Sequence, residues 1–401
     1  MKICLLTNCR PHEGGMTSHM NAFSSGLRKL GHQVKTVSFL GTTDLRQTKN
    51  NFVRKTDYFL TNGNFRTVLI YVLSEIWLFV VLFFSHLIHK YDFIYATDDS
   101  AANVACFFRK YFRLLVIHNV QSSLVKDLLN QKKIKPASFA YKFFSKQQKK
   151  AYQKVDLIIA NSLYMKSEIQ KFCVNHPPIE VSRNLIDEEL FYSDENQKQE
   201  DRRFFGLEND KFIILCPARL VERKGVVYPL LALEQLIHQD RDYFLVYAGE
   251  GPERKVLSES IEQRLLGDFV KLLGQVAYKD LGKLYNAADV IVVPSVTRDG
   301  LCEPLGITAL EGMASAKPVI ASASGGLKET IKDSYNGILV PERDHQAIAQ
   351  AVQWLKENPG RRKELIANGL LEIKNKYGKK EVAQIQMDFI LKSVAQMKAE
   401  A

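Results

Sequence analysis

The sequence predicts an α/β fold of two domains, each built on a parallel β-sheet. With 401 residues the chain is too long for one ordinary core and suits two domains of about 200 residues each. Short apolar runs alternate with helical patterns through both halves. Glycine-rich turns follow several of the apolar runs, as expected where a strand passes into a helix. Alternation of this kind is typical of parallel sheets covered by helices on both faces.

The first half opens as a βαβ unit. Residues 2–7 indicate a buried strand, residues 16–30 a helix ended by Gly31, and residues 33–39 a second strand. Further strands are expected at residues 92–97, 113–118 and 155–160. Residues 161–169 are expected to begin a helix capped by Ser162. No GxGxxG follows the first strand, which argues against a dinucleotide-dependent oxidoreductase.

A polar segment divides the two halves. Residues 193–203, SDENQKQEDRR, contain no apolar side chain, so we predict a linker there. The domains would then be residues 1–192 and 204–378. The second domain repeats the alternation, with strands expected near residues 211–218, 243–248, 269–274, 290–294, 318–322 and 337–340.

A glutamate-containing loop is the most informative feature of the second half. Glu303 precedes Pro304, which suits the first turn of a helix because proline has no N–H to lose. The amides of Leu305 and Gly306 would then be free donors at a positive helix end, where phosphate binds well. Glu311 would follow about 9 Å further along that helix, a suitable distance from a diphosphate to its ribose.

These residues resemble the paired glutamates of glycosyltransferase family 4. Further motifs of that family follow in the expected order and cover most of residues 211–341. They are PARLVERKG (217–225), AGEGPER (248–254), LYNAADVIVVPS (284–295) and GGLKETIKDSYNGILVP (325–341). The resemblance implies the GT-B fold, two facing Rossmann-like domains with an interdomain cleft. It also implies that the last helix, residues 379–401, completes the first domain.

The resemblance assigns roles to individual residues. Arg219 and Lys224 would neutralise the leaving diphosphate, while Gly14 and Gly15 let the backbone approach the donor. Glu303 and His118 would be catalytic residues beside the donor sugar, and Glu311 would hold the ribose. The family retains anomeric configuration and binds its donors without an essential metal, so we expect no cofactor and no metal site.

The acceptor side is less specific in the sequence. Asp98 and Asp99 follow an expected strand and are candidates to contact an acceptor. Asn184 lies where family members often have an Asn-Gly-Val-Asp turn, but Leu185 replaces the glycine. Asn119 departs from the aspartate that often follows the family's histidine, which leaves its role open.

The net charge of +11 lies almost entirely in the first half. Residues 1–200 hold 27 Lys and Arg against 17 Asp and Glu, and lysines are densest from Lys132 to Lys150. Such a patch suits binding to an anionic membrane surface or a phosphorylated acceptor. A solvent-exposed helix face with no binding role would show the same run of lysines. The apolar segment 67–89 is long enough to span a bilayer, but Glu75 and His86 argue for a packed helix. Its outer face would present Ile76, Trp77, Phe83 and Phe84.

The sequence therefore predicts a retaining glycosyltransferase. It would transfer a sugar, a hexose by preference, from a nucleotide diphosphate sugar to a saccharide or lipid-linked acceptor in surface polysaccharide or glycolipid synthesis. A UDP-sugar is favoured over a GDP-sugar, and no nucleic-acid partner is expected. The six cysteines form no CxxC pair, and no signal peptide is indicated, so we expect a cytoplasmic enzyme, peripheral on the membrane face. The alternatives are a transferase acting on a small soluble acceptor, as in sucrose-type synthesis, and a noncatalytic sugar- or membrane-binding subunit.

Overall fold

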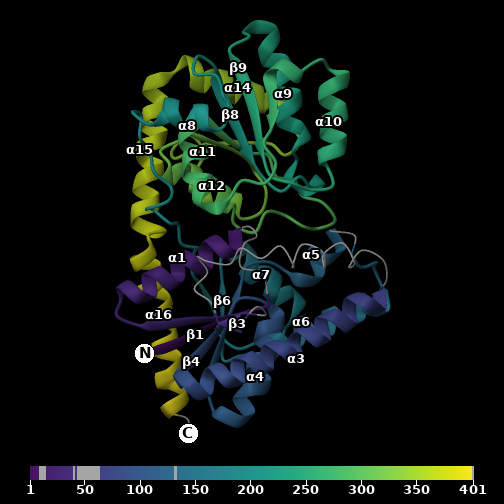
Figure 1. The fold of residues 1–401 in the computed structure, drawn as a ribbon, viewed down its shortest axis with the longest axis vertical. Coiled ribbons are helices and arrows are strands. Elements are labelled where there is room, and N and C mark those ends of the chain that lie inside the picture. The colour runs from purple at the N-terminus through teal and green to yellow at the C-terminus, as the bar shows by residue number, and fades with distance from the viewer. Residues whose placement is uncertain (9–14, 39–40, 43–63, 131–132, 400–401) are drawn as a thin grey trace. The chain divides into compact units, whose positions relative to one another are not determined.

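The computed structural model describes the chain except for residues 9–14, 39–40, 43–63, 131–132 and 400–401. The chain forms two compact units, and each is an α/β layer structure (Figure 1). The first unit contains Met1–Leu185 and Lys379–Ala401, and the second contains Ile186–Gly378. The division lies a few residues before residue 192, where we expected the first domain to end.

The first unit is built on a sheet of seven described strands in the order β3-β2-β1-β4-β5-β6-β7. All neighbouring strands are parallel except β3, which pairs antiparallel with β2. The strands are β1 (Lys2–Thr7), β2 (Gln33–Ser38), β3 (Gly41–Thr42), β4 (Phe93–Ala96), β5 (Leu115–Val120), β6 (Leu157–Ala160) and β7 (Ile179–Val181). Apolar residues are buried on both faces of this sheet, as expected for parallel strands covered by helices.

Helices cover both faces of the first sheet. They are α1 (Gly15–Lys29), α3 (Asn64–His89), α4 (Asp99–Phe112), α5 (Leu124–Asn130), α6 (Phe139–Lys154), α7 (Leu163–Phe172) and α16 (Lys379–Ala399). The predicted cap of α7 is confirmed, because the Ser162 side chain accepts a hydrogen bond from the Met165 amide. The last helix, α16, packs against α1 within this unit. A Cβ added at Gly26 would lie only 2.4 Å from the Lys379 carbonyl oxygen.

The long helix α3 lies alongside α4 and α6 (Figure 1). Leu78 and Leu82 are fully buried, whereas Ile76, Trp77 and Phe84 are more than half exposed. The prediction was wrong for Phe83, which is half-buried because its ring packs on that of Phe112 in α4, with ring centroids 5.9 Å apart. Val68–His89 is long and apolar enough to cross a membrane, with a mean hydropathy of 2.3, and 22% of it is buried against the rest of the chain.

The second unit is built on a six-stranded parallel sheet in the order β10-β9-β8-β11-β12-β13. Its strands are β8 (Phe212–Pro217), β9 (Tyr243–Ala248), β10 (Val270–Leu272), β11 (Val290–Val293), β12 (Val319–Ser322) and β13 (Ile338–Val340). Its α-helices are α8 (Lys198–Phe204), α9 (Val227–Gln239), α10 (Arg254–Gln263), α11 (Leu281–Ala287), α12 (Ile307–Ala314), α13 (Leu327–Thr330), α14 (His345–Glu357) and α15 (Pro359–Lys376). Short 3-10 turns occur at Glu222–Lys224, Gly267–Phe269 and Tyr278–Asp280.

The segment expected to be a linker is instead partly helical. Helix α8 packs within the second unit, where the Arg202 guanidinium lies 2.6 Å from the Asp289 carboxylate. Asp289 also accepts a hydrogen bond from the Ile213 amide at the start of β8. Helix α8 is held in the second unit by ion pairs and has few apolar residues. Its sequence therefore lacks the apolar pattern of a packed helix and resembles that of a linker.

Candidate functional site

The strand order of the second sheet reverses between β8 and β11. The chain runs outward from β8 to β10 on one side and from β11 to β13 on the other. Loops at the carboxyl ends of such neighbouring strands diverge and leave room for a ligand, so this switch point is where α/β sheets bind ligands. The loop after β8 carries Arg219 and Lys224, and the loop after β11 carries Glu303.

Glycines let these loops come together. Gly225 has a φ of +60°, and a Cβ there would lie 2.0 Å from the carbonyl oxygen of Pro294, the residue after β11. Gly325 has a φ of +49°, and a Cβ there would lie 2.3 Å from the Glu303 carbonyl oxygen. Only glycine adopts both conformations without strain and leaves the required space. The two glycine motifs therefore hold the Lys224 and Glu303 loops against each other.

Glu303 is buried and surrounded by donors and positive charge. The Lys224 ammonium lies 2.6 Å from its Oε2, and the Ser295 hydroxyl donates to the same oxygen at 3.0 Å. The Arg223 guanidinium lies 3.5 Å away. Burial alone would raise the pKa of Glu303, but the two cations outweigh it and lower the pKa to about 2. Glu303 is therefore an ionised carboxylate inside the protein.

Arg223 was missed as a site residue by the sequence reasoning, which favoured Arg219 and Lys224. Its side chain is buried, and its guanidinium also donates to the Cys302 carbonyl at 3.4 Å. Arg219, in contrast, is exposed, and its charge contributes to lowering the pKa of Lys224, which burial lowers most. The available signal was the pair of adjacent cations, Arg223 and Lys224, in one turn, because both can face the same buried carboxylate.

Helix α12 begins three residues later than predicted. Pro304 and Leu305 lie before the helix, and Gly306 is its N-cap with a φ of 82°. Leu305 is buried in the core, and its carbonyl accepts a hydrogen bond from the Thr330 hydroxyl at 2.7 Å. The first helical amides are therefore those of Ile307 and Thr308, and such groups have no acceptor within their own helix.

Glu311 lies on α12 and is 7% exposed. The Tyr285 hydroxyl donates to its Oε2 at 2.6 Å. Burial raises the pKa of Glu311 to about 7, and the Tyr285 hydrogen bond and the charge of Lys224 oppose this shift. The second glutamate thus sits near its titration point at neutral pH, unlike Glu303.

In the first unit, His118 and Asp99 are brought together. His118 on β5 is 1% exposed, and its Nε2 lies 3.5 Å from Oδ1 of Asp99, the first residue of α4. Burial lowers the pKa of His118 to about 3. Burial, together with the charges of Asp98 and Asp127, raises the pKa of Asp99 well above its usual range. Burial therefore disfavours the charged form of both members of the pair.

Asp98 acts within the fold. It caps α4 by accepting from the Ala101 amide at 2.9 Å, and its other oxygen accepts from the Thr7 hydroxyl and the Asn8 amide. These contacts tie the end of β1 to α4. The carboxylate of Asp98 thus accepts hydrogen bonds from three donors of its own chain. The predicted contact between Asp98 and an acceptor stays a prediction.

Asn184 belongs to a buried polar network that the sequence did not reveal. Its Nδ2 donates to Gln121 Oε1 at 2.6 Å. Gln121 donates to Asn119, and Asn119 lies 3.3 Å from the Nε2 of His19 on α1. The expected glycine position is filled by Leu185, which is buried in the core between β-strands and α16. Of the two predicted glycines, Gly15 begins α1 and Gly14 lies outside the described residues.

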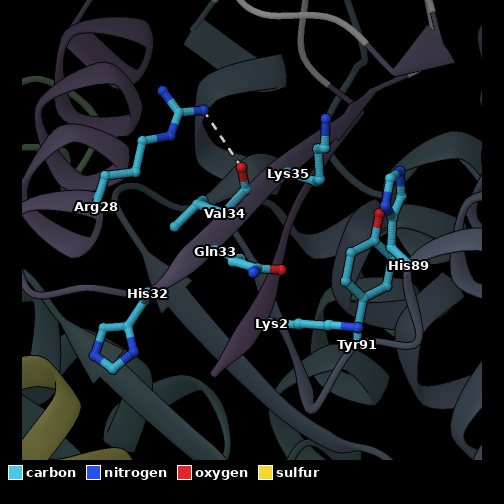
Figure 2. Close-up of a pocket in the computed structure, with 8 residues that line it drawn as sticks. All are labelled: Lys2, Arg28, His32, Gln33, Val34, Lys35, His89 and Tyr91. Carbon is cyan, nitrogen blue, oxygen red and sulfur yellow. Dashed lines mark hydrogen bonds between the residues drawn. The ribbon is translucent and has the colours of Figure 1, made fainter.

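A cavity of about 390 Å³ lies at the other end of the first sheet (Figure 2). It is lined by Lys2, Arg28, His32, Gln33, Val34, Lys35, His89 and Tyr91. These residues lie at the amino ends of β1, β2 and β4, whereas the candidate site residues lie at carboxyl ends. The cavity is basic and does not contain any of the predicted site residues.

Two family models match the chain. The model described as Glycosyltransferase Family 4 matches residues 13–190, and the model described as Glycosyl transferases group 1 matches residues 197–371. Together they cover most of the chain. The boundary between them falls near the division between the two units.

Curated relatives match over part of their length. An uncharacterized glycosyltransferase of Methanocaldococcus jannaschii is 36% identical over 46% of this chain and 45% of its own length. A GDP-mannose-dependent monoacylated alpha-(1-6)-phosphatidylinositol monomannoside mannosyltransferase of Corynebacterium glutamicum is 32% identical over 54% of this chain and 56% of its own length. The chain thus spans about half the length of the curated relatives that it matches.

Solved structures match over nearly the whole chain. Anabaena HepE in complex with UDP-glucose superimposes with a TM-score of 0.73, covering 98% of this chain and 99% of that one at 20% identity. At this identity the likeness concerns the fold. The chain belongs to the group 1 glycosyltransferases of family 4, and its two parallel-sheet units have the GT-B fold.

Proposed function

We propose that this protein is a retaining glycosyltransferase that transfers a hexose from a nucleotide diphosphate sugar to a saccharide or lipid-linked acceptor. The observation that carries the proposal is the buried Lys224–Glu303 pair at the switch point of the second sheet, beside the amino end of α12. An ionised carboxylate, fixed cations and free helix amides meet there. Glycosyl transfer to a new acceptor needs these groups because negative charge grows on the leaving diphosphate while positive charge grows on the sugar ring.

The diphosphate would be held by positive charge and helix amides. Arg219 is exposed and able to reach a ligand, and Lys224 has three donor hydrogens of which one serves Glu303. The amides of Ile307 and Thr308 point along α12 toward its positive end. A doubly charged leaving group would then be stabilised without a metal ion.

Glu303 would act on the donor sugar. Its pKa of about 2 keeps it ionised at any physiological pH, so it can accept hydrogen bonds from sugar hydroxyls and stabilise positive charge on the ring. It need not form a covalent intermediate. Attack on the same face that the diphosphate leaves, assisted by the leaving phosphate, would retain the anomeric configuration. His118, neutral and buried, would contribute a polar ring nitrogen on the side of the first unit.

Glu311 would hold the ribose, because Tyr285 occupies only its Oε2 and its Oε1 can accept from ribose hydroxyls. A UDP-sugar is the donor we favour, in line with the UDP-glucose complex of Anabaena HepE. The Corynebacterium relative is named as GDP-mannose-dependent, so a GDP-sugar is the alternative that binding measurements must test.

The acceptor would be presented at the cytoplasmic face of a membrane. The exposed side of α3 offers apolar side chains, and Lys142, Lys146 and Lys149 are exposed on α6 beside it. The basic cavity in Figure 2 adds Lys2 and Lys35 near the end of α3. Apolar area beside positive charge favours peripheral binding to anionic lipid. A small soluble acceptor would need none of these features.

The proposal is tested first by donor binding. A thermal-shift panel of UDP, GDP, ADP and dTDP should show one nucleotide that raises the melting temperature most, because a ligand stabilises the state that binds it. Arg219→Ala should weaken binding of that nucleotide, whereas Arg264→Ala, an exposed arginine paired with Glu234, should not. The corresponding nucleotide sugars should then be turned over, with release of the nucleoside diphosphate. Failure of every nucleotide to bind would contradict the proposal, and binding without turnover would favour a noncatalytic subunit.

A further inference from the structure

The loop after β11 folds into a small hairpin before it reaches Glu303. The Arg298 amide donates to the Leu301 carbonyl at 2.9 Å, and the Leu301 amide donates back to the Arg298 carbonyl at 2.8 Å. Asp299 and Gly300 form the turn, with φ values of +49° and +71°, as in the two-residue turns that an Asp-Gly pair favours. The returning limb leads within two residues to Glu303, so the anchoring of the hairpin affects the position of that carboxylate.

Thr297, at the base of the hairpin, has each of its polar groups bound by the loop after β13. Its amide and its hydroxyl donate to different oxygens of the Glu342 carboxylate, both at 2.6 Å. Its carbonyl accepts a hydrogen bond from the Arg343 guanidinium, also at 2.6 Å. Burial raises the pKa of Glu342, but hydrogen bonds from Thr297 and Ser324 outweigh it and lower the pKa. Glu342 is therefore an ionised carboxylate that binds the base of the hairpin through two charge-assisted hydrogen bonds.

Arg343 adopts a strained backbone conformation at this contact. Its φ is +64°, in the left-handed region that is unfavourable for a residue with a Cβ. Consecutive side chains of an extended chain point to opposite sides, so the turn at Arg343 lets both its own side chain and that of Glu342 reach Thr297. Backbone strain persists only where the surrounding contacts require it, and it is concentrated at functional sites. The strained residue at this point supports a specific role for the contact with Thr297.

Thr297 connects the two limbs of the loop that hold Glu303. On the outgoing limb, Ser295 donates to Oε2 of Glu303 at 3.0 Å. On the returning limb, the Thr297 hydroxyl lies 3.3 Å from the Sγ of Cys302, the residue before Glu303. The hairpin also forms an ion pair with Glu222, but this side chain is 40% exposed, and exposed ion pairs contribute little. The bonds between Thr297 and the loop after β13 are therefore the stronger anchor.

We infer that Glu342 is a positioning residue, which holds the hairpin of residues 297–301 and through it fixes the carboxylate of Glu303. A catalytic group stabilises a transition state only from the correct place, and a displacement of about 1 Å can lower the rate by about 100-fold. Lys224 and Arg223 keep Glu303 ionised. Glu342 instead restricts the backbone from which Glu303 projects. The inference rests on the proposed function, because it assigns the support of the carboxylate that would act on the sugar.

Transfer kinetics of Glu342→Ala test the inference in the full chain. The turnover number should fall by between about tenfold and 100-fold, while the Michaelis constant for the donor and the affinity for the nucleoside diphosphate stay within about twofold of the wild type. The matched control is Glu372→Ala, which removes a half-buried carboxylate of the same unit that pairs with Lys332 and Lys376. The control should lower the melting temperature slightly and leave turnover unchanged.

Glu342→Gln distinguishes positioning from the effect of charge. The oxygen of a glutamine amide can accept from the Thr297 amide, and its nitrogen can donate to the Thr297 hydroxyl. This variant should therefore keep turnover within about threefold of the wild type. Thr297→Val removes the hydroxyl and should slow turnover less than Glu342→Ala. Combining it with Glu342→Ala should add little to the loss, because both changes break the same contact.

The reactivity of Cys302 reports the position of the loop without any enzymatic turnover. Cys302 is half-buried beside the Thr297 hydroxyl, whereas the other four described cysteines are buried. A thiol reagent, with the modified residue identified by peptide mass spectrometry, should modify Cys302 about tenfold faster in Glu342→Ala than in the wild type, because release of the hairpin exposes the thiol. Glu342→Gln and Glu372→Ala should react at the wild-type rate.

The inference is rejected if Glu342→Ala leaves either turnover or Cys302 reactivity unchanged. It is also rejected if turnover and nucleotide affinity fall in parallel, or if Glu342→Gln is as slow as Glu342→Ala, because Glu342 would then act on the nucleotide or through its charge. Failure of the proposed function is recognised separately, because the wild type would then turn over no nucleotide sugar. The catalytic part of the inference would fail with it, and Cys302 modification would still decide whether Glu342 holds the loop.

Discussion

The two sheets place polar residues at equivalent points but treat charge in opposite ways. In the second unit, Glu303 is buried beside Lys224 and Arg223 and remains ionised. In the first unit, burial lowers the pKa of His118 to about 3, raises the pKa of Asp99, and raises the pKa of Glu75 to about 7. Glu303 follows β11, beside the reversal of strand order in the second sheet, and Asp99 follows β4, beside the reversal in the first. The same topology therefore presents a carboxylate kept ionised by two cations in one unit and buried groups whose charged forms are disfavoured in the other.

The difference fits the proposed function, in which the two units would bind different partners. A nucleotide diphosphate carries negative charge, so fixed cations must already be in place, and a carboxylate can be buried among them. Sugar hydroxyls are neutral and need acceptors and donors without net charge. The comparison suggests that the second unit is organised for the donor and the first for the acceptor. Four predictions test this comparison.

The largest effect is expected from Lys224→Ala. Removing one partner of a buried ion pair leaves Glu303 with Arg223 at 3.5 Å as its remaining cation, which should lower the free energy of unfolding by about 3–5 kcal/mol. Denaturant unfolding at pH 7 measures this. The lowered pKa of Glu303 means that the pair stabilises the fold above its unfolded pKa of about 4.5 and loses this contribution as the pH falls toward 2.

Lys255→Ala is the control for that measurement, because Lys255 lies on the surface of the same unit with only an exposed partner, Glu259. Its effect should be below about 1 kcal/mol. If Lys224→Ala were equally mild, Arg223 alone would be sufficient to hold Glu303, and the charged character of the second site would rest on a different residue from the one proposed.

Glu303→Gln should reduce turnover by about 100- to 1000-fold, as is typical when one electrostatic contact to a transition state is removed. Nucleoside diphosphate affinity should be nearly unchanged, because Glu303 is proposed to act on the sugar and not on the nucleotide. Steady-state kinetics and calorimetry separate these effects. An equal loss of free-nucleotide affinity would show that Glu303 holds the nucleotide instead.

The basic face of the first unit should bind anionic vesicles. Replacing Lys142, Lys146 and Lys149 by Gln should weaken binding to such vesicles by about 100- to 200-fold, given about 1 kcal/mol for each lysine near the surface. Lys255, Lys328 and Lys363 are exposed lysines of the second unit, and their replacement by Gln is the charge-matched control.

Salt distinguishes the outcomes of the flotation assay. Release by salt supports peripheral binding, because exposed charges are screened over about 8 Å at physiological ionic strength and over less as salt rises. Binding that resists salt and requires detergent would indicate that α3 spans the bilayer. No flotation at any salt would exclude the membrane proposal and favour a soluble acceptor.

The smallest effect is expected from the pH dependence of Glu311. The pKa of Glu311 is raised to about 7, so its carboxyl group becomes ionised in the folded protein only as the pH rises through 7. The ionised form is the stronger hydrogen-bond acceptor for the ribose. Nucleotide affinity of Glu311→Gln should therefore equal that of the wild type near pH 6 and be about tenfold weaker near pH 8. Calorimetry with one nucleotide at both values measures this, and the titration of the phosphate cancels in the comparison. A constant ratio across pH would remove Glu311 from the ribose site.

Much of the fold could be predicted from the sequence because the signals are local. A strand buried on both faces reads as a short apolar run, and β8, β9, β11 and β12 all lie within the predicted ranges. The Ser162 cap likewise depends on residues three positions apart. Helices held mainly by ion pairs were harder to predict. Helix α8 was missed because its packing depends on Asp289, which is distant in sequence.

The candidate site was partly predicted. Lys224, Glu303 and Glu311 were identified from glycine-rich motifs and the residues that follow strands, but their sequence positions do not give their partners. Lys224 and Glu303 are 79 residues apart and pair at 2.6 Å because two loops leave neighbouring strands at the same edge. Arg223 was missed since the direction of each side chain in the turn depends on that packing.

The sequence by itself thus determined the alternation of strands and helices, the glycines that allow close backbone approach, and the family. Tertiary structure decided which groups carry charge. Glu303 and Glu75 have the same intrinsic pKa, but Glu303 is buried beside two cations, whereas at Glu75, on an apolar helix, burial outweighs a hydrogen bond from Tyr71 and the charge of Lys150. Ionisation depends on the surroundings in three dimensions, because burial and neighbouring charge shift a pKa in opposite directions and only the fold sets their balance.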